Sequence, residues 1–296
     1  MVEKITVAYD GGPASEAALA WVIDRAHSHE LDVRITTVVG LDPGLPEGAE
    51  LDYHTAFESA LASAERSLRE AAPTASVSTD LRVGLPSDGI ISAAHDCDLL
   101  VIGTNKTSPI AGIMHGTLSL KVAGRAECTT VIVPVDWRPT SGKVVVGWRD
   151  DPTADAALRF GANEAAHRKA ELVIVHSWSS PPSTPFDVDT SAVAAEYIIN
   201  SSRRLLAAAA QRTSKAHPHL EVKQVMHAGS AAVAIVRAAA GASLVVVGSR
   251  GRGAIADLFL GSVSHDVLLN MPAPVAVVPQ KREPIEVYPE LLDENL

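Results

Sequence analysis

The sequence contains very little cysteine. Among its 296 residues only Cys97 and Cys128 carry a thiol, and their spacing is not that of ligands to a shared metal ion. Proteins held together by disulfides are much richer in cysteine, which argues against a disulfide framework. We expect both side chains to be reduced thiols in a cytoplasmic protein.

An excess of positive charge and long apolar runs are also missing. The chain has 25 Lys and Arg residues against 35 Asp and Glu residues, a formal net charge of −10, and no basic cluster offsets it. Such a chain repels a polyphosphate backbone, which argues against nucleic acid as a partner. No apolar stretch approaches the roughly 20 residues that span a bilayer, and the first residues read directly as a strand. We therefore expect no membrane segment.

A glycine-containing segment near the end of the chain carries the clearest chemical signal. Four aliphatic residues, 244–247, lead into Gly248-Ser-Arg-Gly251, and Gly261-Ser262-Val263-Ser264 follows after nine more residues. Glycines after a strand let backbone N–H groups approach a charged ligand. The start of a helix adds unpaired N–H groups and the positive end of its dipole. The segment therefore predicts a phosphate-binding loop.

The same segment occurs earlier in the chain, which indicates an internal duplication. Gly103 and Gly116 lie 145 residues before Gly248 and Gly261. Further upstream the two copies match at a shift of 139 residues, so the second copy has six additional residues. We expect these residues in the Pro- and Ser-rich stretch 179–187.

Apolar strands alternate with helical patterns throughout each copy. In the first copy we expect strands at 5–9, 33–39, 77–83, 99–102 and 131–133, and helices at 14–27, 55–71, 87–94 and 117–123. Strongly apolar strands joined by helices are typical of a parallel sheet covered on both faces. The pattern predicts an α/β fold of two doubly wound parallel-sheet domains with five strands each. In such folds ligands bind beyond the carboxyl ends of the strands.

With Asp10 at the end of the first strand and Gly-x2-Gly-x9-Gly-Ser after the fourth, the chain resembles a tandem universal stress protein over nearly its whole length. The resemblance implies a Rossmann-like fold similar to that of the adenine nucleotide alpha hydrolases. It also implies that ATP, alone or with Mg²⁺, binds to the glycine segment and regulates partner interactions in a stress response. In this family the first-strand Asp lies near the nucleoside. The residue after a second-strand His, here Ser177, gives backbone contacts to adenine.

The resemblance and the duplication together give the candidate binding residues. Those of the second copy are Gly248, Arg250, Gly251, Gly261, Ser262, Val263, Ser264 and Ser177. Those of the first copy are Asp10, Gly103, Gly116, Thr117 and Ser119. Arg250 is included because a guanidinium beside a bound anion pairs readily with phosphate.

Each copy departs from the family pattern at a different place. In the first copy Lys106 replaces the middle glycine, where a Cβ atom hinders a positive φ and close backbone approach. In the second copy the glycines are intact, but Arg149, followed by Asp150, takes the place of Asp10. The residues leave open whether the nucleoside contact is lost, replaced or moved by one residue. We expect the second copy to be the better preserved ATP site.

The main alternative is an ATP-hydrolysing or ATP-pyrophosphatase-type enzyme of a related fold. The run Asp10-Gly-Gly-Pro-Ala-Ser15 is similar to the S-G-G-x-D-S loop of such enzymes, but the first Ser and the Asp of that loop are replaced. A dinucleotide-binding interpretation of Gly251-Arg-Gly253-Ala-Ile-Ala256 leaves too little chain for the rest of that fold. Slow ATP hydrolysis stays an open alternative.

No catalytic residue or metal ligand is predicted. His115 and His265 are the histidines beside the glycine segments, and neither recurs in the other copy. Closely spaced histidines elsewhere supply two ligands without a carboxylate cluster. The chain offers phosphate donors without a repeated base, metal pair or nucleophile, which favours a nucleotide-binding module over an enzyme.

The two copies are expected to form domains 1–138 and 143–280, followed by an acidic tail, 281–296. Domains of this family pair through their last strands. The resemblance therefore implies an intrachain pseudo-dimer across 131–133 and 275–278. Adenine nucleotide is the expected ligand, while protein partners and a further homodimer stay open.

Overall fold

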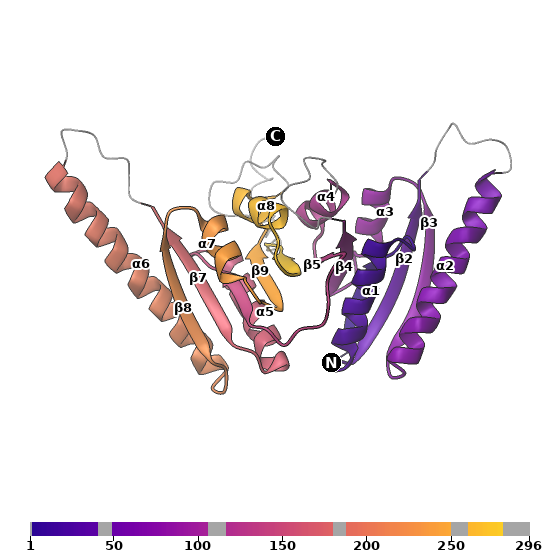
Figure 1. The fold of residues 1–296 in the computed structure, drawn as a ribbon, viewed down its shortest axis with the longest axis horizontal. Helices are drawn as coiled ribbons and strands as arrows, with labels where there is room; N and C mark the ends of the chain where they lie inside the picture. The colour runs from indigo at the N-terminus through magenta and orange to yellow at the C-terminus, as the bar shows by residue number, and fades with distance from the viewer. Residues whose placement is uncertain (1, 41–48, 106–116, 180–187, 250–259, 281–296) are drawn as a thin grey trace, which may run out of the picture.

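The computed structural model describes residues 2–40, 49–105, 117–179, 188–249 and 260–280. Strands and helices alternate in both copies, called the first and second half below (Figure 1). The first half contains β1 (Glu3–Ala8), α1 (Pro13–Ala26), β2 (Leu31–Val39), α2 (Ala49–Ala71), β3 (Ser76–Val83), α3 (Pro86–Ala93), β4 (Leu99–Thr104), α4 (Thr117–Arg125) and β5 (Thr129–Pro134). The second half contains β6 (Val144–Gly147), α5 (Pro152–Arg168), β7 (Leu172–Trp178), α6 (Val188–Ala216), β8 (Val222–Ala228), α7 (Ala231–Ala238), β9 (Leu244–Gly248), α8 (Ser262–Leu269) and β10 (Val275–Val278).

The described strands form one ten-stranded sheet in the order β3-β2-β1-β4-β5-β10-β9-β6-β7-β8 (Figure 1). Neighbouring strands within each half are parallel, in the order of a doubly wound sheet. β5 and β10 pair in antiparallel fashion, with Val275 opposite Ile132 and Val277 opposite Thr130. The expected pairing of the last strands is present, and it joins two five-stranded halves into a single sheet.

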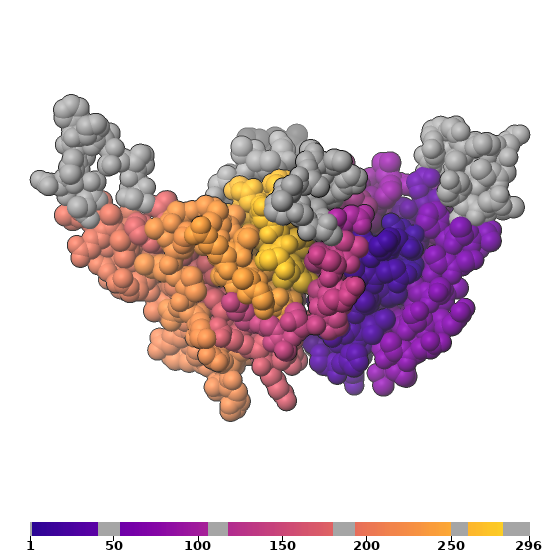
Figure 2. Space-filling model, in the orientation of Figure 1, coloured from indigo at the N-terminus to yellow at the C-terminus, as the bar shows by residue number. Residues whose placement is uncertain are grey.

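Helices cover both faces of this sheet, and each face has a core that runs through both halves. One core contains Trp21 of α1, Leu68 of α2, Ala165 of α5 and Leu206 of α6. The other contains Ile90 of α3, Val122 of α4, Ile235 of α7 and Leu268 of α8. Burial on both faces explains why β4 and β9 are apolar without alternation. Figure 2 shows the two halves in contact with each other on one face of the molecule.

Helix α6 is longer than its counterpart α2, with 29 residues against 23. It begins 139 residues after the start of α2 and ends 145 residues after the end of α2. The prediction that the six additional residues belong to the stretch 179–187 is therefore wrong. They lengthen α6 by about 9 Å, at 1.5 Å per residue. The alanine, leucine and arginine residues of α6 have high helix propensity, which favours the longer helix.

A buried ion cluster joins α1 to α5. Arg25 donates hydrogen bonds to both carboxylate oxygens of Glu164, at 2.8 and 2.7 Å, and to both of Glu3, at 2.7 and 2.9 Å. The side chains of Arg25 and Glu164 are 3% and 4% exposed. Burial by itself would lower the pKa of Arg25 and raise that of Glu164, but their pairing places the pKa of Arg25 above and that of Glu164 below its usual value. The Arg25–Glu164 ion pair thus joins the two halves in addition to the pairing of β5 with β10.

Within the described ranges, no helix has both the length and the apolar character that a membrane crossing requires.

Candidate functional site

The carboxyl ends of the strands bring predicted binding residues together in each half. β1 lies between β2 and β4, and β6 lies between β7 and β9, so the winding of the chain reverses at two places in the sheet. Asp10 follows β1 beside Gly103 of β4, and Arg149 follows β6 beside Gly248 of β9. Ligands of open α/β sheets bind at such reversal points. The structure therefore assembles one candidate site in each half.

In the first half Asp10 holds the turn between β1 and α1. Its Oδ1 accepts hydrogen bonds from the Gly12 N–H at 2.9 Å and from the Ser15 hydroxyl at 2.6 Å. Gly11 of this turn has a φ of +78°, a conformation that glycine adopts without strain. The side chain of Asp10 is exposed, and its Oδ2 makes no hydrogen bond to another described residue. One carboxylate oxygen is thus fixed by the protein and the other is open to solvent.

In the second half the carboxylate that fixes this turn lies at Asp151. Its Oδ1 accepts a hydrogen bond from the Ala154 N–H at 2.9 Å, which caps α5, and its Oδ2 accepts one from Arg149 Nε at 3.0 Å. Asp151 is buried, whereas the side chain of Arg149 is 51% exposed. A half-exposed cation therefore stands at the strand end where the first half has Asp10.

Both halves anchor the end of the first strand through a buried aromatic residue. The Tyr9 hydroxyl donates to Glu16 of α1, and the Trp148 indole N–H donates to Asp155 of α5 at 2.9 Å. Burial, followed by the hydrogen bond to Glu16, raises the pKa of Tyr9 above its usual value. The Trp148 ring therefore packs in the interior core.

The second strand of each half fixes the same aromatic residue from the other side. Thr37 of β2 donates to the Tyr9 carbonyl at 2.6 Å, and Nδ1 of His176 in β7 lies 3.1 Å from the Trp148 carbonyl. Since a carbonyl only accepts, this contact identifies His176 Nδ1 as the protonated nitrogen. His176 thus orients the strand end that precedes Ser177.

Ser177 lies where β7 extends past β6. The last pair between these strands joins Gly147 to Val175, and Ser177 pairs only with His227 of β8. Its hydroxyl donates to the carbonyl of Gly229 and lies 3.4 Å from that of His227. The backbone of Ser177 therefore has an edge toward the reversal point that β6 does not cover.

Gly103 and Gly248 are required by packing at the ends of β4 and β9. A Cβ atom on Gly103 would lie 1.9 Å from the Ala14 carbonyl oxygen, and one on Gly248 would lie 2.7 Å from Cγ2 of Thr153. Ala14 and Thr153 lie in the first turns of α1 and α5. Both glycines let a helix begin close to a strand end, which is a structural requirement separate from any phosphate contact.

The hydroxyls of Ser119 and Ser264 bond to the protein. Ser119 donates to the Gly103 carbonyl at 3.2 Å, and Ser264 lies 2.9 Å from the Gly261 carbonyl and 3.4 Å from that of Ser249. Both side chains are buried. Ser119 attaches the start of α4 to the end of β4, and Ser264 attaches the start of α8 to the end of β9. Their hydroxyls therefore stabilise the positions of these helix starts.

Helix α8 begins directly beside the end of β9. The Gly261 N–H donates to the Ser249 carbonyl at 2.7 Å, and the first N–H groups of the helix, at residues 262–264, precede its first internal hydrogen bond. Ser262 and Val263 are exposed. Unpaired N–H groups at a helix start, next to a glycine-containing strand end, suit an anionic ligand.

Several predicted residues lie outside the described part of the chain. They are Gly116, Arg250 and Gly251, together with Lys106 and the tail 281–296. Thr117 begins α4, and its side chain is likewise outside the description.

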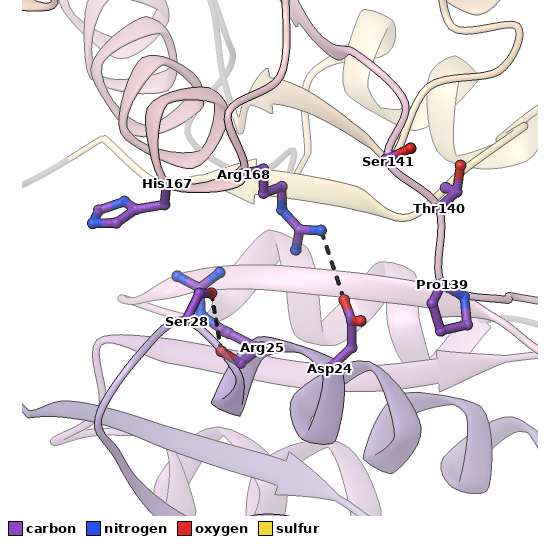
Figure 3. Close-up of a pocket in the computed structure, with 8 residues that line it drawn as sticks. All are labelled: Asp24, Arg25, Ser28, Pro139, Thr140, Ser141, His167 and Arg168. Carbon is purple, nitrogen blue, oxygen red and sulfur yellow. Dashed lines mark hydrogen bonds and ion pairs between the residues drawn. The ribbon is translucent and has the colours of Figure 1, made fainter.

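A separate cavity of about 370 Å³ lies between the halves (Figure 3). It is lined by Asp24, Arg25, Ser28, Pro139, Thr140, Ser141, His167 and Arg168. Arg168 reaches toward Asp24, with 3.8 Å between Nη1 and Oδ2. None of the predicted binding residues lines this cavity, so it is not the predicted site.

Asp151 and Ser15 are site residues that the glycine motifs did not indicate. Asp followed by Pro is the usual pairing of a helix N-cap with a first helical residue, and this signal was present at Asp151-Pro152. Ser15 keeps the last serine of the run that is similar to S-G-G-x-D-S, but that likeness did not indicate its bond to Asp10, which depends on the fold of the turn.

Comparison with known proteins agrees with this architecture. A universal stress protein of Mycobacterium tuberculosis is 27% identical over 290 residues, covering 93% of this chain and 97% of that protein. A second one from the same organism is 25% identical over 305 residues, covering 95% and 96%.

Solved structures show the same fold. The crystal structure of a universal stress protein from Archaeoglobus fulgidus has a TM-score of 0.69 at 21% identity and covers 93% of this chain and 98% of that one. A protein from Pseudomonas aeruginosa, described as a putative universal stress protein, has a TM-score of 0.67 at 17% identity and covers 94% of both chains. The universal stress protein family model matches twice, at residues 1–134 and 140–279. The chain therefore belongs to the universal stress protein family, with two copies of the family's domain in tandem.

Proposed function

We propose that the protein binds ATP at the carboxyl ends of its strands, that the second half holds the better preserved site, and that occupancy regulates partner interactions in a stress response. The observation that carries the proposal is the start of α8, which lies beside the end of β9 through the 2.7 Å bond from Gly261 to Ser249 and whose N–H groups at residues 262–264 make no hydrogen bond to a described residue. The regulatory role follows from family membership.

A guanidinium at the neighbouring strand end supports phosphate binding in the second half. β6 pairs with β9, and Arg149 follows β6. Asp151 occupies two of its nitrogens, which leaves further N–H donors of a half-exposed guanidinium for an anion. Asp151 balances the charge of Arg149, so the contribution of Arg149 to phosphate binding is its remaining N–H donors.

The adenine end is supported by the backbone edge of Ser177. That edge lies beyond the last pair between β6 and β7, so β6 does not occupy its polar groups and they can bond to the base. Any Mg²⁺ would be held chiefly by the phosphates, since the described residues contain no group of three His, Cys, Asp or Glu side chains that could hold a metal ion. As part of this proposal we place the protein in the cytoplasm, where Cys97 and Cys128 would be kept as the free thiols that the structure has.

The test is purification without added nucleotide, followed by native mass spectrometry and chromatography of the released ligand. ATP retained by the protein and stable for hours is the expected result. Rapid turnover to AMP and pyrophosphate would favour the enzyme alternative, and a protein that takes up no nucleotide even after ATP is added would refute the proposal.

A further inference from the structure

Cys97 and Cys128 lie in contact at the amino-terminal ends of β4 and β5. Their Sγ atoms are 3.2 Å apart. β4 and β5 pair from Leu99 and Thr129 onward, so the register of the sheet places the residues just before these strands side by side. Both cysteines belong to connecting segments, where the backbone can adjust more readily than within a strand.

The second half shows that the fold does not need thiols at these positions. The residues 145 positions further along are Ala242 and Ala273, and both are buried in the corresponding core. A small apolar residue is thus sufficient for packing. Two thiols therefore occupy, in one half only, a pair of adjacent positions that alanine fills in the other.

The two thiols differ in accessibility and in acidity. Cys97 is partly exposed, whereas Cys128 is buried. The hydrogen bond between the two thiols lowers the pKa of Cys97, while that bond and burial raise the pKa of Cys128. Thiolate is the nucleophilic form of cysteine, so an oxidant reaches and reacts with Cys97 first.

We propose that Cys97 and Cys128 form a reversible intramolecular disulfide when the protein meets a hydroperoxide. The Cys97 thiolate attacks the terminal peroxide oxygen, the O–O bond breaks, and the leaving oxygen departs as water or an alcohol after taking a proton. The product is a sulfenic acid on Cys97. The Cys128 thiol then attacks that sulfur, the S–O bond breaks, and a water leaves. Two thiols and one hydroperoxide thus give one disulfide, one water and one further water or alcohol.

The distances and the topology favour this product. The sulfurs need to approach by about 1 Å to reach the disulfide bond length. The bond would close a loop that contains β4, the first-half glycine segment and α4. It would therefore lower the conformational entropy of the unfolded chain. The oxidation would take place in the half that contains Asp10. The proposal does not depend on nucleotide binding.

The test uses the full chain, reduced, freed of reductant and treated with hydrogen peroxide. We expect both thiols to disappear together, the intact mass to fall by two hydrogen atoms, and a peptide map without reductant to show Cys97 linked to Cys128. Dithiothreitol should restore both thiols. The double variant Cys97→Ala/Cys128→Ala reproduces the second-half arrangement and is the control for folding.

Single variants separate the two roles. In Cys128→Ala, dimedone should capture a sulfenic acid on Cys97. In Cys97→Ala, the buried Cys128 should react with peroxide at least about tenfold more slowly. The proposal is overturned by intermolecular disulfides or Cys97 sulfinic acid in place of the linked peptide, or by equal rates in the two single variants.

Discussion

Arg25 and Glu164 stand at equivalent positions of the two halves, 139 residues apart, and form a buried pair with two hydrogen bonds of 2.8 and 2.7 Å. In a symmetric dimer of identical halves, a residue on the twofold axis meets its own copy, and two arginines or two glutamates would repel each other. A tandem chain can place opposite charges there. The pair therefore ties each half to its partner within the chain.

Breaking this pair should be costly. Glu164→Ala leaves a buried guanidinium with Glu3 as its remaining carboxylate partner among the described residues, and we expect the free energy of unfolding to fall by about 3–5 kcal/mol in denaturant titrations at pH 7. Arg125→Ala is the matched control. Its partner is Asp88, and these side chains are 40% and 50% exposed, so the loss should stay at about 0–1 kcal/mol. Equal losses in the two variants would contradict the role given to the buried pair.

Acid should weaken the same junction. Pairing holds the pKa of Glu164 below its ordinary value of 4.5, so near and below that value the unfolded chain binds more protons than the folded one. The stabilisation is complete above the ordinary pKa and is lost as the pH falls through the lowered folded value. The difference in unfolding free energy between the protein and Glu164→Gln should stay constant between about pH 7 and pH 5 and shrink at lower pH. A difference that grows with acid would rule out this linkage.

The glycines at the strand ends should respond differently to alanine. In Gly248→Ala the new Cβ meets a side-chain methyl of Thr153, and we expect a loss of about 1–3 kcal/mol. Thr153→Ser removes that methyl, so the double variant should recover most of the loss relative to Thr153→Ser alone. In Gly103→Ala the obstacle is the backbone of Ala14, which no side-chain change removes, and the loss should be larger. Thermal and denaturant unfolding measure all four variants. Failure of Thr153→Ser to compensate would show that the contact is not the cause.

Asp151 combines two roles that can be separated. Asp151→Ala removes both the cap of α5 and the partner of Arg149, and should cost about 1–2 kcal/mol of unfolding free energy. Asp151→Ser keeps an oxygen for the Ala154 N–H but no carboxylate for Arg149. It should lie between the wild type and Asp151→Ala in the same titration. If Asp151→Ser is as unstable as Asp151→Ala, capping contributes nothing measurable.

Much of the fold could be predicted because its signals are local. The strands at β4 and β9 are uninterrupted apolar runs, and Pro13 and Pro152 mark helix starts. The repeat then extends each assignment to the other half. The predicted position of the six extra residues was wrong. Proline and serine indicate a loop, but they do not show whether the loop or the helix after it contains the additional residues.

The site was predictable only in outline. The glycine pattern located the strand ends, but it could not show that Gly103 and Gly248 are needed for contact with Ala14 and Thr153, since that contact joins segments far apart in the sequence. The same limit applies to Asp151, whose pairing with Arg149 depends on the path of the turn.

The most direct test of nucleotide binding by the second half is calorimetric titration of nucleotide-free protein with ATP, comparing the wild type with Gly251→Lys and Lys106→Gly. Lys106 and Gly251 are equivalent residues of the two glycine segments, and each variant gives one half the residue that the other half has at this position. We expect one tight site per chain in the wild type, a loss of at least about tenfold in affinity for Gly251→Lys, and a second tight site in Lys106→Gly. Unchanged affinity and stoichiometry in Gly251→Lys would contradict the account.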